Sequence, residues 1–218
     1  MTGDLPLGPP ESCAMPCAIL ALDASSARVS AAFAERVAEA PGERDQAAAL
    51  VRLAAAVLAG GRPAAVAATV GPGSFTGIRA ALALAQGLAL GFGVPAVAVS
   101  SAEALAAAAG EGRVLAAIDS RRGHVFLAGF TVQAGIPAEL LPPFVWRPGE
   151  PLPAGPWRVV GDAAAFIDPL AAPSWPEARQ VARVAAARLA GAIAARPFVP
   201  LYVDRPAVRA PAGAAIAC

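Results

Sequence analysis

Short apolar runs alternate with longer segments in which apolar residues recur every three or four positions, and this alternation predicts an α/β chain. In the first half, runs bounded by turn residues predict strands over residues 17–23, 29–33, 36–40, 64–70 and 96–100. Helical spacing predicts helices over residues 45–59, 76–91 and 102–109. Ser100 and Glu103 have the spacing of a capping box at the start of the last helix.

The same order of elements recurs in the second half of the chain. Strands are expected over residues 114–119, 124–131 and 157–161, and the proline-rich tract 137–156 predicts a connection with one edge strand at most. Ser174, Pro176 and Glu177 indicate the start of a helix that runs to about residue 195. Two successive β-rich units, each followed by helices, predict a duplicated two-lobed architecture with a reduced second copy.

These patterns predict four regions along the chain. Residues 1–16 are rich in proline and glycine, which favours a disordered extension, and Met15 offers a second candidate start of translation. Residues 17–103 are expected to form the first lobe and residues 104–205 the smaller second lobe. Residues 206–218 are expected to be a flexible tail.

The composition limits what the chain can do. Hydrophobic residues make up 57% and charged residues 15%, so the surface carries more apolar area than usual, either because alanine is abundant or because a permanent protein interface exists. All 17 basic residues are arginine, which excludes Schiff-base chemistry on lysine and the lysine of a P-loop. A net charge of +1 gives no global attraction to nucleic acid.

The cysteine content and one long uncharged run bear on where in the cell the chain is expected. Three cysteines, Cys13, Cys17 and Cys218, are too few for a disulfide framework and favour a reducing, cytoplasmic compartment. Residues 80–102 form an uncharged run that is long enough to span a membrane. Glycines interrupt this run, so a buried helix followed by a buried strand is the preferred interpretation, with no membrane partner.

The stretch 71–79, GPGSFTGIR, follows a predicted strand and precedes a predicted helix, where α/β proteins often bind phosphate. Its three glycines have neither the spacing of a dinucleotide fingerprint nor the lysine of a P-loop. Ser74 is not in the frame of a nucleophile elbow either. Spacing alone leaves two alternatives, a phosphate-binding loop or a tight turn that starts the helix.

Other candidate residues lie at strand ends. Asp23 and Ser25 follow the first strand, in a pattern typical of either a phosphate-binding hairpin or an Asx turn. The pattern recurs in residues 119–123 (DSRRG), which supports duplication. His124 is the only histidine, so no histidine pair for a metal is available, and a solvent-facing position in a hairpin is expected for it.

The helix that follows the glycine-rich stretch carries two rows of small residues. Ala83, Gly87 and Gly91 lie on one face, and a second row begins at Gly77 and continues through alanines. Gly87 lies in the helix interior, where glycine costs about 1 kcal/mol relative to alanine. One row suffices for packing on a sheet, so the other is predicted to contact a partner.

Several segments together resemble the bacterial TsaB (YeaZ) family. The likeness covers about residues 17–205 and is carried by residues 19–25 (ILALDAS), 71–79 (GPGSFTGIR), 85–89 (AQGLA), 114–121 (VLAAIDSR) and 200–203 (PLYV). The resemblance implies an actin-like fold of the Hsp70 and sugar-kinase type. Family members often carry a histidine before the first helix, where this chain has residues 44–46 (RDQ), and His124 replaces what is commonly an acidic residue.

The resemblance also implies a function. Members of this family are non-catalytic subunits in the formation of N6-threonylcarbamoyladenosine at position 37 of tRNAs that read codons beginning with A. They activate the kinase-like subunit TsaD, act beside the ATPase TsaE, pair with themselves when alone, and meet tRNA indirectly through the complex. No catalytic residue, metal or cofactor is therefore expected in this chain.

The resemblance places the partner interface on the first two helices. The residues expected at the interface are Leu50, Leu53, Val57, Thr76, Arg79, Ala80, Ala83, Gly87 and Gly91. The residues expected to form a vestigial phosphate loop are Asp23, Ser25, Gly71, Gly73 and Ser74.

Two other functions remain open from the sequence. One is an autonomous ATP-binding hydrolase or glycoprotease-like enzyme of the same superfamily. The other is a tRNA-binding module that uses a basic stripe on the last helix, formed by Arg179, Arg183, Arg188 and Arg196.

Overall fold

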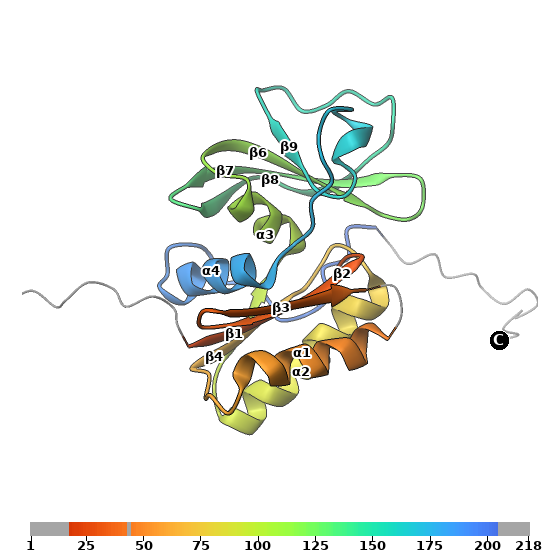
Figure 1. Ribbon diagram of the computed structural model, residues 1–218. Helices are drawn as coiled ribbons and strands as arrows, with labels where there is room; N and C mark the ends of the chain where they lie inside the picture. The colour runs from red at the N-terminus through yellow and green to blue at the C-terminus, as the bar shows by residue number, and fades with distance from the viewer. Residues whose placement is uncertain (1–17, 43–44, 205–218) are drawn as a thin grey trace, which may run out of the picture.

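The computed structural model describes residues 18–42 and 45–204, so the expectations for residues 1–16 and 206–218 and for the three cysteines lie outside the described residues. Within this part, two lobes are stacked, each built on one β-sheet (Figure 1).

The first lobe contains a five-stranded sheet in the order β3-β2-β1-β4-β5. Its strands are β1 (Ile19–Asp23), β2 (Arg28–Phe33), β3 (Arg36–Pro41), β4 (Ala65–Thr69) and β5 (Ala96–Val99). β1, β2 and β3 form an antiparallel meander, and β4 and β5 continue the sheet parallel to β1. β1 and β4 are buried along their whole length, which explains why their sequences are apolar at every position except their last residues.

The second lobe repeats this topology with one strand fewer. Its sheet has the order β8-β7-β6-β9, with strands β6 (Gly112–Asp119), β7 (Val125–Gln133), β8 (Ile136–Trp146) and β9 (Arg158–Val160). Here too an antiparallel meander is extended by a strand parallel to its first member. The common strand order confirms the duplicated α/β architecture with a reduced second copy.

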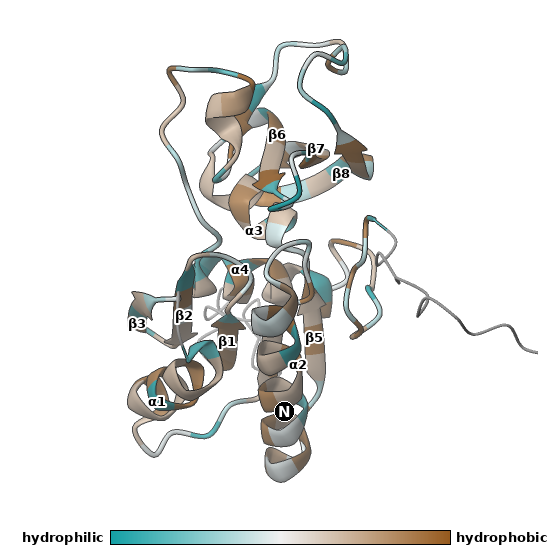
Figure 2. Ribbon diagram, turned by 90° about the vertical axis from the view of Figure 1, so that its right-hand side faces the viewer, coloured by the Kyte–Doolittle hydropathy of each residue, from teal (hydrophilic) through white to brown (hydrophobic). Residues whose placement is uncertain are grey.

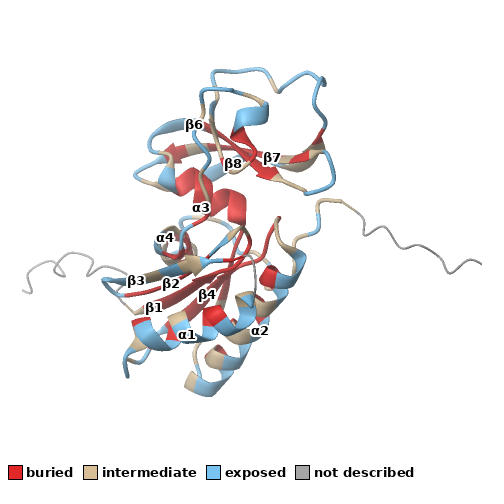
Figure 3. Cartoon of the chain, turned by 45° about the vertical axis from the view of Figure 1, so that its right-hand side comes forward, coloured by how far each residue is buried: buried red, intermediate tan, exposed pale blue. Residues whose placement is uncertain are grey.

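In the described part of the chain, four α-helices cover the sheets in layers. They are α1 (Gln46–Leu58), α2 (Phe75–Phe92), α3 (Ser101–Ala108) and α4 (Ala178–Leu189), and a short 3₁₀ helix, η1 (Ala164–Phe166), lies in the second lobe. α1 and α2 lie side by side on the outer face of the first sheet, and α3 and α4 lie between the two sheets (Figure 3). The capping box of α3 is present, with both the Ser100 and the Glu103 hydrogen bond formed.

The last helix differs from its prediction at both ends. Ser174 does not cap it, because the Ser174 hydroxyl accepts a hydrogen bond from the backbone N–H of Gly161. The first N–H of the helix, at Ala178, instead donates to the Ser30 hydroxyl of β2 at 3.0 Å. The helix ends at Leu189 because Gly191 adopts a left-handed conformation and closes a Schellman motif.

After the second lobe, the chain returns to the first lobe. The predicted boundary between residues 103 and 104 therefore does not separate the two lobes completely. One side of α4, with Val181 and Val184, packs against β1, β4 and β5 in one apolar cluster. Residues 198–201 then pack beside Val70 and Ile78. Residues within 104–205 therefore complete the core of the first lobe.

The uncharged run 80–102 is a helix followed by a strand. Gly93 ends α2 in a left-handed conformation, and β5 begins three residues later. By length and composition α2 could cross a membrane, but an apolar helix packed on a core meets the same criterion. α2 lies beside the first sheet (Figure 2). It packs on the sheet through its row of small residues, which includes Ala81, Ala85 and Ala89.

Candidate functional site

A cleft of about 590 Å³ lies between the lobes. Three parts of the chain line it. The first lobe contributes the hairpin after β1 and the glycine-rich loop, the second lobe contributes the hairpin after β6 and Asp162, and residues 200–204 complete the lining. The two strand-end motifs identified in the sequence therefore face a common space.

The first hairpin is closed by a buried carboxylate. Oδ1 of Asp23 accepts hydrogen bonds from the Ser25 hydroxyl at 2.7 Å, from the Ser25 N–H at 3.2 Å and from the Thr69 hydroxyl at 2.6 Å. Within residues 18–42 and 45–204, Oδ2 of Asp23 has no hydrogen-bond partner. Burial raises the pKa of Asp23 to about 6, although the three hydrogen bonds act to lower it.

The glycine-rich loop packs directly onto this hairpin. The N–H of Ser74 donates to the Ser25 carbonyl at 2.7 Å, and the Ser74 hydroxyl caps α2 by accepting from the N–H of Gly77. A Cβ atom at Gly73 would lie 2.1 Å from the Ser25 carbonyl oxygen. Of the two alternatives, a phosphate-binding loop or a tight turn, the structure favours the tight turn. Its glycines permit close backbone contact, and the N–H groups of Ser74 and Gly77 donate hydrogen bonds within the protein.

The second hairpin contains an arginine bound by two carboxylates. Nε of Arg121 lies 3.3 Å from Asp119, and its Nη2 lies 3.9 Å from Asp162. Asp162 also accepts a hydrogen bond from the N–H of Asp119. Burial raises the pKa of Asp162, and the nearby charge of Asp119 acts in the same direction. The positive charge of Arg121 is therefore paired with the carboxylates of Asp119 and Asp162.

His124 is not solvent-facing, contrary to expectation. Its side chain is 11% exposed and its ring meets Phe126 edge-on at 5.3 Å. Its Nε2 lies 3.6 Å from the Asp204 carboxylate, so the histidine lies where the second lobe meets the end of the described chain. Among the residues that the structure describes, no group of three His, Cys, Asp or Glu side chains is placed to hold a metal ion.

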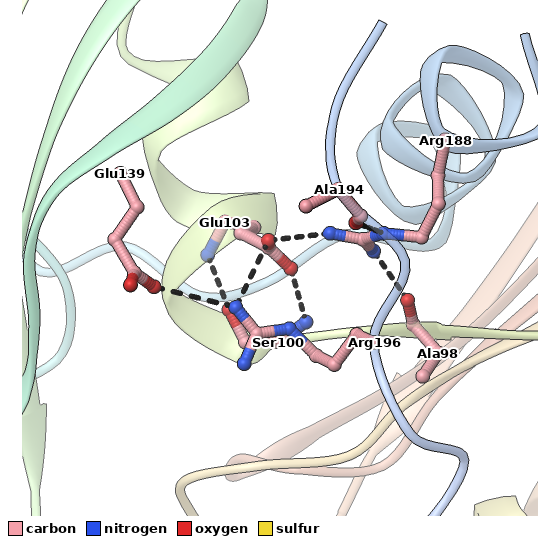
Figure 4. A network of polar contacts seen from close by, with 7 residues as sticks. All are labelled: Ala98, Ser100, Glu103, Glu139, Arg188, Ala194 and Arg196. Atoms are coloured by element: carbon pink, nitrogen blue, oxygen red, sulfur yellow. Dashed lines mark hydrogen bonds and ion pairs between the residues drawn. The ribbon is translucent and has the colours of Figure 1, made fainter. Parts of the chain in front are cut away.

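A second polar cluster connects α3, α4 and β8 (Figure 4). Oε1 of Glu103 accepts hydrogen bonds from Arg188 at 2.6 Å and from Arg196 at 3.2 Å, and Arg196 also reaches Glu139 of β8. Arg188 and Arg196 therefore do not form a basic stripe for tRNA, as one hypothesis required. The carboxylate of Glu103 holds both of them inside the molecule.

The outer face of α1 and α2 is the third candidate site. Exposed residues are Phe75, Thr76, Arg79, Ala83, Gly87 and Gly91 of α2, and Ala80 and Leu53 are half-buried. Leu50 and Val57 were expected at the interface but are buried in the core of the first lobe. They face the sheet because the apolar side of an amphipathic helix packs against the hydrophobic core. Val51, which is 52% exposed, faces outward on α1 instead.

Sequence reasoning missed three residues of these sites. Thr69 ends β4 beside Asp23, and Asp162 follows β9 and lies beside Asp119 at the end of the neighbouring strand β6. Tyr202 accepts a hydrogen bond from Arg79, and the two residues are 123 positions apart in the chain. The motif 200–203 was noted in the sequence, but no local pattern indicates what Tyr202 contacts.

The raised pKa of Asp23 gives a test of this description. A carboxyl whose folded pKa exceeds its unfolded value of 3.8 stabilises the folded state most at low pH, and this contribution is lost as the pH rises to about 6. Asp23→Asn should remove the effect, so that its stability relative to wild type rises by about 2–3 kcal/mol between pH 4 and pH 7. Urea denaturation at both pH values measures this. Glu35→Gln, on the exposed turn after β2, is the control, and parallel pH profiles for Asp23→Asn and wild type would contradict the assignment.

Comparisons with known sequences find similarity to TsaD and TsaB proteins. Residues 52–143 match the family model described as TsaD, tRNA N6-adenosine threonylcarbamoyltransferase. A stretch of 64 residues is 49% identical to the tRNA threonylcarbamoyladenosine biosynthesis protein TsaB of Escherichia coli (strain K12), and it spans 28% of each chain. The similarity to this curated relative is therefore confined to about a quarter of its length.

Solved structures from Pseudomonas aeruginosa match over most of the chain. A protein described as having similarity to peptidase YEAZ aligns with a TM-score of 0.75 and 28% identity, over 85% of this chain and 99% of that one. The YeaZ structure aligns with a TM-score of 0.72 and 28% identity, over 84% of this chain and 98% of that one.

The two stacked lobes with a common strand order define a protein of the actin-like α/β class. Within that class, the comparisons support an assignment to the TsaB (YeaZ) family.

Proposed function

We propose that this chain is a non-catalytic subunit in the formation of N6-threonylcarbamoyladenosine at position 37 of tRNAs that read codons beginning with A. In this role it binds and activates a TsaD-like subunit in the cytoplasm. A TsaE-like ATPase acts beside the pair, and tRNA meets the chain only through the complex. When it is alone, the chain pairs with itself.

The exposed face of α2 is the observation that carries this proposal. Gly87 and Gly91 lie in the helix on its solvent side, and nothing approaches within 4 Å of the position that a Cβ atom would occupy. Glycine weakens a helix, so a compensating contact is expected outside the chain. Leu90 is 85% exposed on the same helix. An apolar surface of this kind is typical of a protein interface.

The state of the cleft supports a non-catalytic role. The hydroxyl of Ser25 and the N–H of Ser74, which would face a phosphate in an active loop, are bonded to Asp23 and Ser25 within the protein. Binding a phosphate there would require these hydrogen bonds to break.

Gly87→Leu should leave the fold intact, because the position is open, and should weaken binding to a TsaD-like subunit at least about tenfold by steric overlap. Size-exclusion chromatography and titration calorimetry of the pair measure the loss. Arg179→Leu places the same side chain at an exposed position of α4 and should bind like wild type. Unchanged affinity for Gly87→Leu would remove this face from the interface.

Reconstitution of the tRNA modification with and without this chain tests the function itself. Modification at the same rate without the chain would overturn the scaffold role.

A second candidate is an autonomous ATP-binding hydrolase or glycoprotease-like enzyme. The observation in its favour is the size of the cleft, since a volume of about 590 Å³ suits a nucleotide-sized ligand. Hydrolysis of ATP or of a peptide by the pure chain, abolished by Asp23→Ala, would support this candidate over the first.

A further inference from the structure

One arginine on the outer face of α2 is held by two neighbouring aromatic side chains and has no counter-ion among the described residues. The guanidinium carbon of Arg79 lies 3.6 Å above the centre of the Phe75 ring, and its Nη2 donates a hydrogen bond to the Tyr202 hydroxyl at 2.9 Å. None of the ion pairs formed within residues 18–42 and 45–204 includes Arg79. The side chain is exposed, so its remaining N–H groups are open to a ligand.

The three side chains come from two well-anchored segments. Phe75 and Arg79 are one helical turn apart at the start of α2. Tyr202 follows Leu201, whose N–H donates to the Val70 carbonyl at 2.7 Å and whose side chain packs on the first lobe. The rings of Phe75 and Tyr202 lie 6.2 Å apart and are each about half exposed. The guanidinium is therefore oriented before any ligand arrives, which lowers the entropy cost of binding.

The position of this cluster relates it to the proposed interface. Phe75, Arg79, Ala83, Gly87 and Gly91 follow one another at intervals of four residues, and all of them are exposed. The arginine thus lies at one end of the row that carries the open glycines. It is the only charged residue in this row, and α2 contains no carboxylate.

We propose that Arg79, stacked on Phe75 and held by Tyr202, receives a carboxylate side chain of the partner protein. This inference rests on the proposed function, because it assumes that the partner covers the face of α2. A planar guanidinium with free N–H groups matches a carboxylate in shape and charge. A second copy of the chain would offer no carboxylate from α2, so the site favours a different protein over self-association.

The surroundings favour protein over nucleic acid. A surface that binds RNA neutralises several phosphates and needs several cations for this. The row on α2 offers one cation among apolar and small residues. One buried charge pair at the end of an apolar interface is instead typical of protein recognition, where it fixes the orientation of the partners.

The test measures the affinity of the full chain for a TsaD-like subunit at low and at high ionic strength. Arg79→Gln should weaken binding about tenfold or more and reduce its dependence on salt. Arg79→Lys keeps the charge but loses the planar stacking and should lie between. Tyr202→Phe removes the hydroxyl and should weaken binding a few-fold. Arg179→Gln, at an exposed position of α4, is the matched control and should bind like wild type.

The outcomes separate the inference from the function on which it rests. If the wild-type chain forms no complex, the proposed function fails. If it forms a complex that Arg79→Gln leaves unchanged in affinity and salt dependence, the proposed function stands and this inference is overturned. If Arg79→Gln weakens only the binding of tRNA to the assembled complex, the ligand is a phosphate of RNA and the inference is also overturned.

Discussion

Glu103→Gln should lower the free energy of unfolding by about 3–5 kcal/mol, the cost of breaking a buried ion pair by removing one partner. The Glu103 and Arg188 side chains are only 6% and 7% exposed, so Arg188 would keep its charge in a largely buried place without a carboxylate. The change preserves the size of the side chain, which isolates the effect of charge. Urea denaturation followed by circular dichroism measures the loss.

The matched control removes an exposed carboxylate. Glu39 pairs with Arg28 on the first sheet, and both side chains are about half exposed, so Glu39→Gln should cost less than about 1 kcal/mol. Equal losses for Glu103→Gln and Glu39→Gln would contradict a structural role for the buried cluster.

The pH dependence offers a second measurement on the same variant. Burial by itself would raise the pKa of Glu103, but Arg196, Arg188 and the Ser100 N–H together hold this pKa below its usual value. A carboxyl of this kind contributes stability above its unfolded pKa of 4.5, and the contribution is lost as the pH falls through the folded pKa. The difference between wild type and Glu103→Gln should therefore shrink in acid.

Gly77→Ala should destabilise the chain by about 3 kcal/mol, although alanine is the better helix former. A Cβ atom at Gly77 would lie 1.8 Å from the Ala24 carbonyl oxygen and 2.6 Å from Oε1 of Gln46. The nearer atom belongs to the backbone, so α2 and the first hairpin would have to separate. Thermal and urea denaturation measure the effect.

Gly87→Ala gives the opposite expectation in the same helix. Nothing lies within 4 Å of the new methyl group, so the variant should gain up to about 1 kcal/mol from helix propensity. A gain or no change for Gly77→Ala would mean that α2 and the hairpin do not approach as closely as described.

The two glycines explain how far sequence reasoning could go on α2. Small residues at intervals of four correctly indicated two faces that permit close approach. The two rows by themselves did not indicate which face would pack on the sheet, since both consist of small residues. In the structure the row of Gly77, Ala81 and Ala85 is buried and the row of Ala83 and Gly87 is exposed, because Ile78 and Leu82 lie beside the first row and need the core.

Local signals determined the elements and the family. Strand burial, helix capping and tight turns depend on residues that are close in sequence. The sequence alone therefore indicates the apolar runs, the Ser100 capping box and the turn in the stretch 71–79. The error at the end of α4 also has a local cause, since Gly191 was available as a C-terminal signal.

Only the tertiary structure decided which polar groups meet. Asp23 contacts Thr69 across 46 positions, Glu103 contacts Arg188 across 85, and Arg79 contacts Tyr202 across 123. Such pairs produce no periodic pattern in the sequence, because each contact depends on how sheets and helices pack and not on the sequence neighbours of either residue. The sequence by itself therefore determined a duplicated α/β chain that resembles the TsaB family. The packing of the two lobes decided that the glycine-rich loop is bonded to the hairpin after β1 and that a buried carboxylate holds Arg188 and Arg196. It also decided that Arg79 is exposed and, within the described residues, contacts Phe75 and Tyr202 without an ion pair.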